Sequence, residues 1–540
     1  MKIALYGLPC SGKTTLMAAL KNIRSVNGSE TLNKMSGGKF SSLVESEKVR
    51  LREEYAKYIG SLQDNMVISD GHYSFMNNVV FTEKDASVYD VFIYLYCRPE
   101  LICERYSCSQ KNKKYAGLSL QRITDWQDKE IEELRSVCHC LKKDFYVVKS
   151  EEITPHVFAD FLNSIKNGFS SYDIAERIAQ KIKAVFPQPC RLYLCDGDKT
   201  LIEQDSFELC SGGYKTHVFD GSFYTGFQSW LFSCEICNIG LNHEKLKELT
   251  INRAIYKRIE GKNFVVLSSG LTELWRMIGE RFKIDHIFAD TMISADTKYY
   301  VARLLRESGY SVTAFGDSKN DLYMLRTADI GYLYLGHRMS VSLRKADVSG
   351  IRLIYDKAPV IINESDTKAV SADIKICRSD SGINGARLAA AHFRCGQITG
   401  EYISRLIPEK NTAVVVLERG GRFFGDGLYC AFGGALYTVR GSCGEIPFFK
   451  CDKVIIADSV INTGASVLKM ISVLEERNPH IRIIIAANVI QKAAIELLKN
   501  YKIFAVRISN NSFVGRNQSF QSGGFGPDTA DRLFNILNAQ

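Results

Sequence analysis

Two carboxylates separated by one residue follow an apolar run near the middle of the chain. The run 192–195 leads directly into Asp196, and Asp198 comes two positions later. Such a run predicts a buried strand, and open α/β sheets bind their ligands at the carboxyl ends of their strands. We expect the two acids to alternate along this strand, face the same way and share a cation. One carboxylate could then attack phosphorus while the other exchanges protons with the leaving group.

A phosphate-binding pattern opens the chain. Residues 2–6 predict a short strand, residues 7–15 read GLPCSGKTT, and residues 16–23 predict a helix. This is the G-x-x-x-x-G-K-[ST] pattern in its strand, loop and helix context, where backbone N–H groups surround the phosphates of ATP. In such a loop the lysine reaches the terminal phosphates and the following threonine ligates Mg²⁺. The residues of this loop that we expect to bind ATP are Gly7, Gly12, Lys13, Thr14 and Thr15.

Two later strands narrow the class of kinase. One is predicted to end at Asp70, and residues 91–96 predict another that leads toward Arg105. With the phosphate loop, these segments resemble nucleoside and nucleotide kinases of the adenylate kinase type. The resemblance implies that Arg105 lies beside the adenine and that the basic segment 107–122, which ends in Arg122, forms a lid. Catalysis in such a site consists mostly of positioning and charge stabilisation.

Asp70 has two interpretations in this first domain, which we expect to span residues 1–187. As a catalytic residue it would position the acceptor hydroxyl or a water on Mg²⁺, and as a strand-end acid it would cap a helix. His72 nearby is interpreted as a packing or hydrogen-bonding residue. The acceptor itself is not identified by the sequence.

Three segments downstream of Asp196 complete a second pattern. They are a strand that ends at Ser268, an amphipathic helix that opens with Lys298, and a strand followed by Asp317 and Asp321. Their order and spacing resemble haloacid dehalogenase-type phosphatases, particularly the phosphoserine phosphatase-like branch. The resemblance covers the whole of a second domain and implies hydrolysis of a phosphate ester.

The resemblance gives each of these residues a role. Asp196 would be the nucleophile and Asp198 the general acid and base. Ser268 and Lys298 would hold the phosphoryl group, with Ser269 as the alternative to Ser268. Magnesium suits an all-oxygen site of this kind, and the lysine offsets carboxylate repulsion of an incoming phosphate. The residues expected at the metal of this domain are Asp196, Asp198, Asp317 and Asp321.

An insert rich in aromatic residues and glycine lies inside this second domain, which we expect to span residues 190–356. Residues 203–262 fall where the resembled family places a helical cap that selects the substrate. Its aromatic side chains could stack on a base, or they could form the core of the cap. The aromatic residues in question are Phe223, Tyr224, Phe227 and Trp230.

A third phosphate-binding pattern occupies residues 453–466, where an apolar strand, Asp458 and a turn of small residues precede a helix. N–H groups at the helix start can bind a phosphate, and Asp458 can accept hydrogen bonds from ribose hydroxyls. The stretch resembles the phosphoribosyl pyrophosphate (PRPP) loop of type I phosphoribosyltransferases. The residues of this stretch expected at PRPP are Asp458, Asn462, Thr463, Gly464, Ala465 and Ser466.

Two flanking segments, residues 414–427 and 526–534, resemble uracil phosphoribosyltransferase. The resemblance implies that Arg419 binds pyrophosphate. Pro527 departs from the family pattern because it replaces a glycine and removes an N–H donor, and Asn462 replaces a small apolar residue. We therefore expect phosphoribosyl transfer in residues 358–540. Two points stay open: whether uracil is the acceptor, and whether the domain has lost transfer activity and only binds its ligands. The residues expected at the base are Pro527, Asp528, Thr529 and Asp531.

Length and composition limit the number of domains and the class of protein. A chain of 540 residues predicts about three domains, here three doubly wound α/β domains. No apolar run approaches the ~20 residues of a membrane span and no leader is recognised, so we expect a cytoplasmic protein without a membrane partner. The 16 cysteines are scattered and show no zinc pattern, and the cluster 138–140 lacks a second half-site. A net charge of +9 suits nucleotides as well as nucleic acid.

The combination constrains the function. A kinase and a phosphatase acting on one hydroxyl would only hydrolyse ATP, so their substrates, positions or timing must differ. We expect nucleotide salvage or remodelling, with Mg²⁺, ATP and PRPP as cofactors and nucleotides, nucleosides or bases as substrates. Repair of nucleic-acid ends is the alternative, because polynucleotide kinase-phosphatases pair the same two domains in this order; the third domain and the modest charge disfavour it. A nucleotide-sensing regulatory or defence protein is a further alternative, and a homodimer is expected by analogy.

Overall fold

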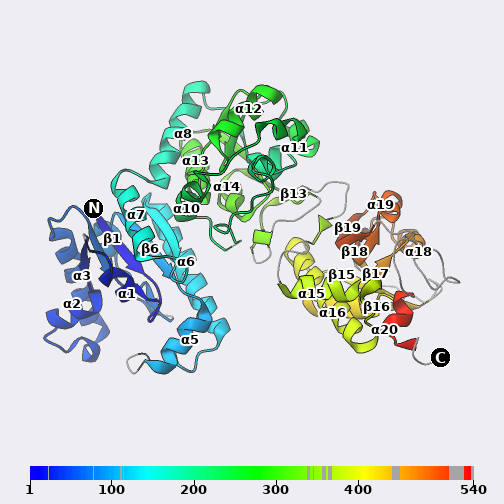
Figure 1. Ribbon diagram of the computed structural model, residues 1–540, viewed down its shortest axis with the longest axis horizontal. Helices are drawn as coiled ribbons and strands as arrows, with labels where there is room; N and C mark the ends of the chain where they lie inside the picture. Colours follow the sequence, from blue (N-terminus) through cyan, green and yellow to red (C-terminus); the bar gives the residue numbers. More distant parts are fainter. Residues whose placement is uncertain are drawn as a thin grey trace. The chain divides into compact units, whose positions relative to one another are not determined.

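Three parallel sheets, each flanked by helices, make up the chain (Figure 1). This computed structural model confirms the predicted α/β fold class. It describes residues 1–540 apart from residues 22, 77, 110–111, 113–114, 221, 337–340, 344–345, 355–359, 363–367, 441–450, 510–527 and 537–540.

The first sheet has five strands in the order β2-β3-β1-β6-β7, all parallel. The central strands are apolar and fully buried, as is usual for a parallel sheet covered on both faces. Its strands are β1 (Lys2–Tyr6), β2 (Arg24–Val26), β3 (Val67–Asp70), β6 (Val91–Tyr96) and β7 (Asp144–Lys149), beside a small hairpin of β4 (Ser74–Phe75) and β5 (Asn78–Val79). Its helices are α1 (Lys13–Ala18), α2 (Gly28–Met35), α3 (Glu45–Ser61), α4 (Glu83–Val88), α5 (Pro99–Cys108), α6 (Leu120–Leu141), α7 (Pro155–Lys166) and α8 (Ser171–Val185).

Alternate residues of these strands face two separate cores. One core joins Ile3 and Leu5 to α1 and α7, and the other joins Ala4 and Tyr6 to α3 and α6. Helix α6 begins where the Ser119 side chain accepts the N–H of Arg122 and ends at a left-handed residue, Lys142. Helix α1 is shorter than the predicted 16–23, because the chain turns at Ala19 and enters β2.

The second sheet has six strands in the order β10-β9-β8-β11-β12-β13. Its central strand β8 ends at Cys195, before either acid of the central motif, so the prediction that both acids alternate along the strand is wrong. Its strands are β8 (Arg191–Cys195), β9 (Phe264–Ser268), β10 (Ile287–Ala289), β11 (Ser311–Gly316), β12 (Ile330–Tyr334) and β13 (Arg352–Ile354). Its helices are α9 (Ser206–Cys210), α10 (Gly226–Ile236), α11 (Arg253–Ile259), α12 (Thr272–Phe282), α13 (Ala295–Glu307) and α14 (Leu322–Thr327).

The insert 203–262 contains the helices α9, α10 and α11, and two of its aromatic residues lie in the cores of the first sheet rather than in a core of the insert. Phe227 is buried in the core of the first sheet, against Phe161 at 4.9 Å between ring centroids. Phe223 packs on Tyr96 of β6. The start of α10 also binds the edge strand β7, because Thr225 Oγ1 accepts the N–H of Val147 and Gln228 Nε2 donates to its carbonyl. The insert therefore joins the second sheet to the first.

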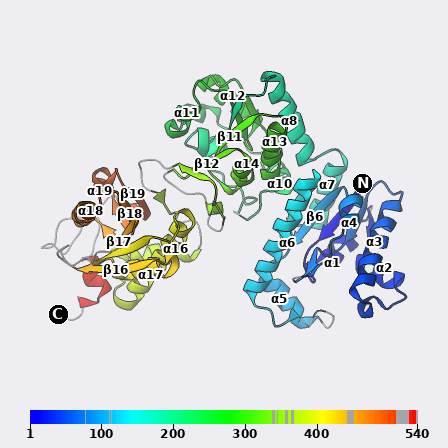
Figure 2. The ribbon, with the colours of Figure 1, turned by 180° about the vertical axis from the view of Figure 1, so that it is seen from behind.

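The third sheet has six parallel strands in the order β14-β19-β18-β17-β15-β16. Helices α18 and α19 share a core with one face, and α17 lies on the other, where Gly425 adjoins Val416 (Figure 2). Its strands are β14 (Val360–Ile361), β15 (Thr412–Glu418), β16 (Ala435–Arg440), β17 (Lys453–Ile461), β18 (Arg482–Gln491) and β19 (Lys502–Ser509). Its helices are α15 (Lys368–Cys377), α16 (Gly385–Leu406), α17 (Arg422–Phe432), α18 (Ala465–Arg477), α19 (Lys492–Leu498) and α20 (Thr529–Leu533).

The chain divides into two compact units, which is coarser than the three predicted domains. One unit comprises Met1–Asn252, Ile259–Ala314 and Tyr323–Asp329, and the other comprises Arg253–Arg258, Phe315–Leu322 and Ile330–Gln540. The division passes through the second sheet, because β8, β9, β10 and most of β11 belong to the first unit and β12 and β13 belong to the second. The first sheet and most of the second thus belong to one unit, and the third sheet belongs to the other.

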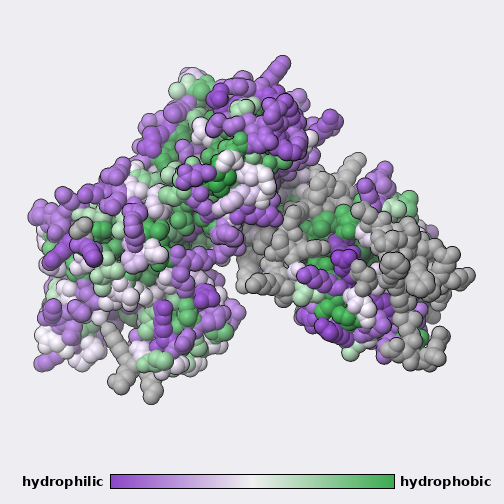
Figure 3. Space-filling model, viewed as in Figure 1, coloured by the Kyte–Doolittle hydropathy of each residue, from purple (hydrophilic) through white to green (hydrophobic). Residues whose placement is uncertain are grey.

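Hydrophilic side chains cover most of the described surface visible in Figure 3, and hydrophobic ones gather there in small separate patches. Within the described parts of the chain, no helix is both long enough and apolar enough to cross a membrane.

Candidate active sites

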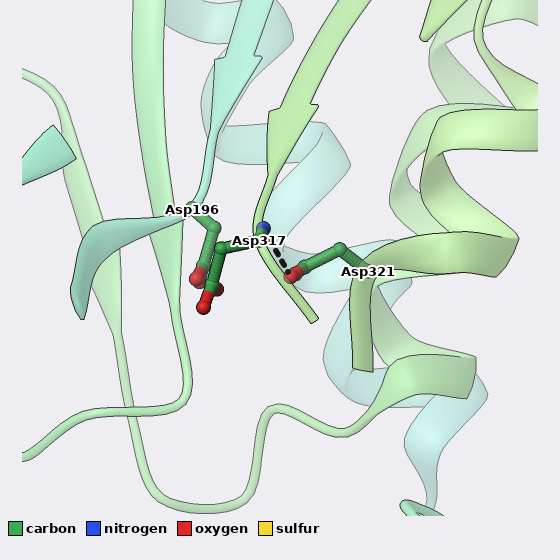
Figure 4. A group of neighbouring side chains, drawn as sticks. All are labelled: Asp196, Asp317 and Asp321. Atoms are coloured by element: carbon green, nitrogen blue, oxygen red, sulfur yellow. Dashed lines mark hydrogen bonds between the residues drawn. The ribbon is translucent and has the colours of Figure 1, made fainter. Parts of the chain in front are cut away.

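Three carboxylates meet at the carboxyl edge of the second sheet. Asp196 follows β8, Asp317 follows the neighbouring strand β11, and Asp321 lies in the turn beyond it (Figure 4). Among the described residues these three form a group in which one oxygen of each carboxylate lies within 4.8 Å of the others. The strand order produces this group, since the ends of adjacent parallel strands share one edge. An all-oxygen set of this size fits Mg²⁺.

The Asp321 side chain is held in place by hydrogen bonds. Its side chain is completely buried, and its Oδ2 accepts the N–H of Asp317 at 3.2 Å. The N–H and hydroxyl of Ser318 donate to the same oxygen at 3.2 and 3.0 Å. These bonds fix the turn after β11 and orient the carboxylate toward the other two (Figure 4).

Asp196 is paired with a buried lysine. The Nζ of Lys298 donates to Asp196 Oδ1 at 2.5 Å, and the Lys298 side chain is only 1% exposed. Thr200 Oγ1 donates to the other oxygen, Oδ2, at 3.5 Å. An ammonium group in a water-poor site stabilises charge that develops on a phosphoryl group next to the carboxylate.

Asp198 lies outside the carboxylate group, in the turn that follows β8. Its Oδ1 accepts the N–H of Ser206 at 2.7 Å and its Oδ2 accepts the indole N–H of Trp275 at 3.3 Å. Burial, with the charge of Asp205 as a smaller cause, raises the pKa of Asp198 to about 6. A carboxyl group with this pKa can both donate and accept a proton near neutral pH, as a general acid and base requires. Its role as a metal ligand stays a prediction.

The geometry separates Ser268, the last residue of β9, from Ser269, which follows it. The Ser268 hydroxyl is buried and lies beside Gly197, where an added Cβ would be 2.8 Å from its Oγ. The Ser269 hydroxyl instead donates to the carbonyl of Ile293 at 2.6 Å. Ser268 is therefore the serine that lies beside the turn between Asp196 and Asp198.

A cavity of about 1660 Å³ lies at the phosphate loop of the first sheet. Lys13 is buried there, and its Nζ donates to the carbonyls of Gly7 and Leu8 at 2.6 and 2.9 Å. Burial lowers the pKa of Lys13 to about 8, and the charge of Asp70 acts in the opposite direction. Neither Gly7 nor the exposed Arg122 lines this cavity. The predicted ATP-binding residues that line it are Gly12, Lys13, Thr14, Thr15 and Arg105.

Asp70 and His72 also line the cavity, and both make structural contacts. Asp70 Oδ1 accepts the N–H of Gly28 at 2.6 Å, which is the helix-capping interpretation realised at the start of α2. His72 Nδ1 bonds to the carbonyl of Gly7 at 2.9 Å, and its ring packs on Phe75. Asp70 therefore holds α2 beside the phosphate loop while its carboxylate faces the cavity.

The third sheet brings together residues that are more than 100 positions apart in sequence. Arg419, after β15, pairs with Asp531 of α20 through Nη2 and Oδ1 at 2.8 Å. Gly420 lies next to Asp458, since an added Cβ would be 3.6 Å from Asp458 Oδ1. Burial, with the charge of Asp528 as a smaller cause, raises the pKa of Asp458 to about 7. The predicted pyrophosphate, ribose and base residues are thus neighbours.

The turn before α18 contains the residues that we predicted to bind PRPP. Gly464 is left-handed, with φ of 80°, and the helix begins at Ala465 and continues through Ser466. Thr463 Oγ1 accepts the N–H of Ala465, and Asn462 Oδ1 accepts from Gln491 Nε2 at 2.8 Å.

The described part of the predicted base loop is the start of a helix. Asp528 is the N-cap of α20, where its Oδ1 accepts the N–H groups of Ala530 and Asp531, and Thr529 is the first residue of the helix. Pro527 lies outside the described residues. The contribution of Pro527 to base binding therefore stays a prediction.

The sequence analysis did not identify two residues that contact Asp196 and Asp198. Thr200 reaches Asp196, and its position four residues after that acid in a turn was an available signal. Trp275 reaches Asp198 from α12, and no local pattern indicated it. A contact between residues this far apart in sequence depends on the order of the strands in the sheet, which local sequence patterns do not give.

One comparison with known protein families gives a match in the part of the chain that forms the third sheet. A family model described as uracil phosphoribosyltransferase matches residues 445–536. The match includes Asp458 and the turn before α18 but not Arg419. None of the curated proteins matches this chain. Part of the chain is thus similar to a phosphoribosyltransferase family, which supports an enzyme at the level of the family.

The solved structures that match parts of this chain include a phosphoribosyltransferase and two hydrolases. The xanthine-guanine-hypoxanthine phosphoribosyltransferase of Helicobacter pylori is 15% identical, with a TM-score of 0.20, and the match covers 23% of this chain and 84% of that one. A phosphoserine phosphatase is 18% identical, with a TM-score of 0.21, covering 31% and 94%. A HAD family hydrolase from Salmonella enterica serovar Typhi is 17% identical, with a TM-score of 0.21, covering 33% and 75%. We base no functional conclusion on likenesses at this level.

Proposed function

We propose that this chain is a multifunctional enzyme of nucleotide metabolism that hydrolyses a phosphomonoester, phosphorylates a second substrate with ATP, and transfers a phosphoribosyl group from PRPP to a base. The observation that carries the proposal is the buried pair of Asp196 and Lys298 beside Asp317 and Asp321. A carboxylate nucleophile, a lysine and an acidic metal set at one sheet edge are the parts that phosphoryl transfer through an aspartyl-phosphate needs.

The proposed hydrolysis assigns a role to each of these side chains. Asp196 attacks phosphorus, and the bond from phosphorus to the ester oxygen breaks while Asp198 gives that oxygen its proton. A water oxygen then attacks phosphorus, Asp198 takes a proton from that water, the bond from phosphorus to Asp196 breaks, and inorganic phosphate leaves. Asp317 and Asp321, with Asp196, would hold Mg²⁺, which supplies positive charge at the phosphate oxygens. Lys298 and Ser268 would hold the transferring group.

The kinase part of the proposal rests on the phosphate loop and its cavity. Lys13, Thr14 and the N–H groups at the start of α1 face a cavity large enough for a nucleotide and an acceptor. Asp70 lies in the same cavity, where its carboxylate can orient an acceptor hydroxyl.

The transferase part rests on the family match and on the arrangement of Arg419, Asp458 and Asp531. Asp458 would accept hydrogen bonds from the ribose hydroxyls, and Arg419 would bind the pyrophosphate once PRPP displaces Asp531. Uracil is the base that the matched family indicates, and we propose it as the first acceptor to test.

The proposal is tested by a mass-spectrometric screen of the full-length protein with ATP, PRPP and Mg²⁺. Its substrates are bases, nucleosides, nucleotides and labelled oligonucleotide ends. We expect conversion of small molecules, formation of UMP from uracil, and loss of ATP-dependent phosphorylation alone in the Lys13→Ala variant. Turnover of oligonucleotide ends without any small-molecule product would contradict the nucleotide-metabolism role in favour of end repair. Absence of UMP would reject uracil.

A further inference from the structure

The first turn of α13 connects the phosphatase nucleophile to the kinase sheet. Asp296 and Lys298 are two residues apart on this helix. At about 100° per residue, their side chains point to opposite sides of the helix axis. Lys298 contacts Asp196 on one side, and Asp296 contacts α6 of the first sheet on the other.

The contact on the kinase side is charged and buried. Asp296 Oδ1 lies 2.7 Å from His139 Nε2 and 3.3 Å from Arg135 Nε. The three side chains are only 3, 8 and 6% exposed, respectively. Burial alone would raise the pKa of Asp296, but Arg135 and His139 hold it below its usual value. Asp296 is therefore an ionised carboxylate held between two residues of the kinase helix.

Both partners are themselves fixed in place. Arg135 Nη1 donates to the Tyr323 hydroxyl at 2.7 Å, and its guanidinium lies 4.7 Å from the centre of that ring. The His139 ring stacks on Tyr299 of α13 at 3.9 Å. Since Arg135 and His139 are one turn apart on the long helix α6, they hold Asp296 from a rigid support.

A buried ion pair of this kind adds little net stability compared with apolar packing of the same volume, because both charges must be desolvated. Its best-supported use is to fix the register of the elements that it joins. Here the element that is fixed carries Lys298, so a shift of its first turn would move the ammonium group away from Asp196.

We propose that Asp296 is a positioning residue of the phosphatase, and that the kinase helix α6, through Arg135 and His139, holds Lys298 in its working position. The inference rests on the proposed phosphatase function. It makes the kinase domain a structural part of the phosphatase site, although no kinase residue touches the phosphate.

The test measures Mg²⁺-dependent hydrolysis of p-nitrophenyl phosphate by the full-length protein and its Asp296→Asn variant. A misplacement of about 1 Å can cost about 100-fold in rate, so we expect kcat to fall about 10- to 100-fold with a smaller change in KM. ATP-dependent phosphorylation should be unchanged, because none of Asp296, Arg135 and His139 lines the cavity at the phosphate loop.

Two further variants separate positioning from folding. Asp296→Asn leaves Arg135 buried without its charge partner, whereas the double variant Arg135→Met with Asp296→Asn removes both charges and should recover the melting temperature. We expect the double variant to remain slow. Arg303→Met is the matched control, since Arg303 also donates from α13 to α6 but lies five residues beyond Lys298. We expect it to hydrolyse at nearly the normal rate.

The outcomes are distinct. A double variant that regains both its melting temperature and its full kcat would overturn the inference, and so would an Arg303→Met variant as slow as Asp296→Asn. Failure of the wild-type protein to hydrolyse any phosphomonoester would instead contradict the proposed function itself. Normal hydrolysis by the wild type and by Asp296→Asn would contradict only the positioning role.

Discussion

Single residues at the two carboxylate sites are tuned in different ways. Asp196 stays paired with Lys298, whereas burial raises the pKa of Asp198 to about 6 and that of Asp458 to about 7. A nucleophile needs its negative charge, and a proton-transfer group needs a pKa near the working pH. The environments of Asp196 and Asp198 agree with the roles that we propose for them, Asp196 as the nucleophile and Asp198 as the general acid and base.

Asp458 yields a prediction about pH. Ribose hydroxyls donate hydrogen bonds to the ionised carboxylate, so binding of PRPP favours the deprotonated form. With a pKa of about 7 in the free protein, the ionised fraction rises about tenfold between pH 6 and pH 8. We expect the affinity for PRPP, measured by isothermal titration calorimetry, to rise over this range by up to that factor.

The Asp458→Asn variant is the control for this measurement, because PRPP titrates as well. The variant should bind PRPP more weakly and show only the pH dependence of the ligand's own phosphates. An identical pH dependence in both proteins would contradict the role of Asp458.

At this scale the sequence predicted the members of each site better than their contacts. Asp196, Lys298, Asp317 and Asp321 were named from local patterns, because each follows a strand or opens a helix. The bond from Trp275 to Asp198 could not be predicted, since it depends on how α12 packs across the turn after β8. Asp70 was correctly given helix capping as one of its interpretations, but the helix that it caps was not predicted.

At the scale of elements, helices α16 and α17 pack unusually closely. An alanine Cβ at Gly427 would lie 2.0 Å from the carbonyl of Phe393, and one at Gly396 would lie 2.0 Å from the carbonyl of Phe424. Gly427, one of the glycines that were associated with the phosphoribosyltransferase pattern, therefore serves the packing of α17 on α16.

We predict that Gly427→Ala destabilises the third sheet. Because backbone atoms of α16 cannot move aside cheaply, the free energy of unfolding should fall by about 1–3 kcal/mol or more. Denaturant unfolding of the full-length protein, followed by hydrogen exchange in α16 and α17, measures this.

Gly240→Ala is the matched control, since an added Cβ there meets nothing within 4 Å. Its effect should stay within about 0.5 kcal/mol. Equal destabilisation by both substitutions would contradict the close-packing account.

The element boundaries show where sequence patterns stop being sufficient. The strand over residues 91–96 was predicted with its observed bounds, because a continuous apolar run defines a buried parallel strand. The strand before Asp196 was predicted to continue as far as Asp198, but it ends at Cys195. The spacing of the two acids resembles strand alternation, whereas the chain there forms a turn in which Lys199 has a φ of 58°. Core packing was one of the two interpretations of Phe227, and Phe227 is indeed buried in a core, but that core belongs to the first sheet.

At the scale of the whole molecule, the first sheet and most of the second form one compact unit. Contacts from α10 to β7 and from α13 to α6 join them. The sequence could not predict that the two sheets are joined, because the motifs of each predicted domain are complete without the other domain.

This joining predicts an effect across the sequence boundary. Phe227 belongs to the insert 203–262 of the second sheet but is buried in a core of the first sheet, so Phe227→Ala should destabilise that core by about 3–5 kcal/mol. Hydrogen exchange should rise in β7 and α7. Phe232→Ala, on the same helix but in the core of the insert, is the control and should increase exchange within residues 203–262. Increased exchange confined to the insert in both variants would contradict the joined unit.

The most direct test of the central claim is Mg²⁺-dependent hydrolysis of p-nitrophenyl phosphate by the full-length protein and by its Asp196→Asn variant. The account predicts hydrolysis by the wild type and a loss of at least about 10³-fold in kcat in the variant, because the amide cannot act as the nucleophile. Phosphorylation by the kinase site and phosphoribosyl transfer should persist in the variant. Hydrolysis that survives in Asp196→Asn, or a wild-type protein that cleaves no phosphomonoester, would contradict it.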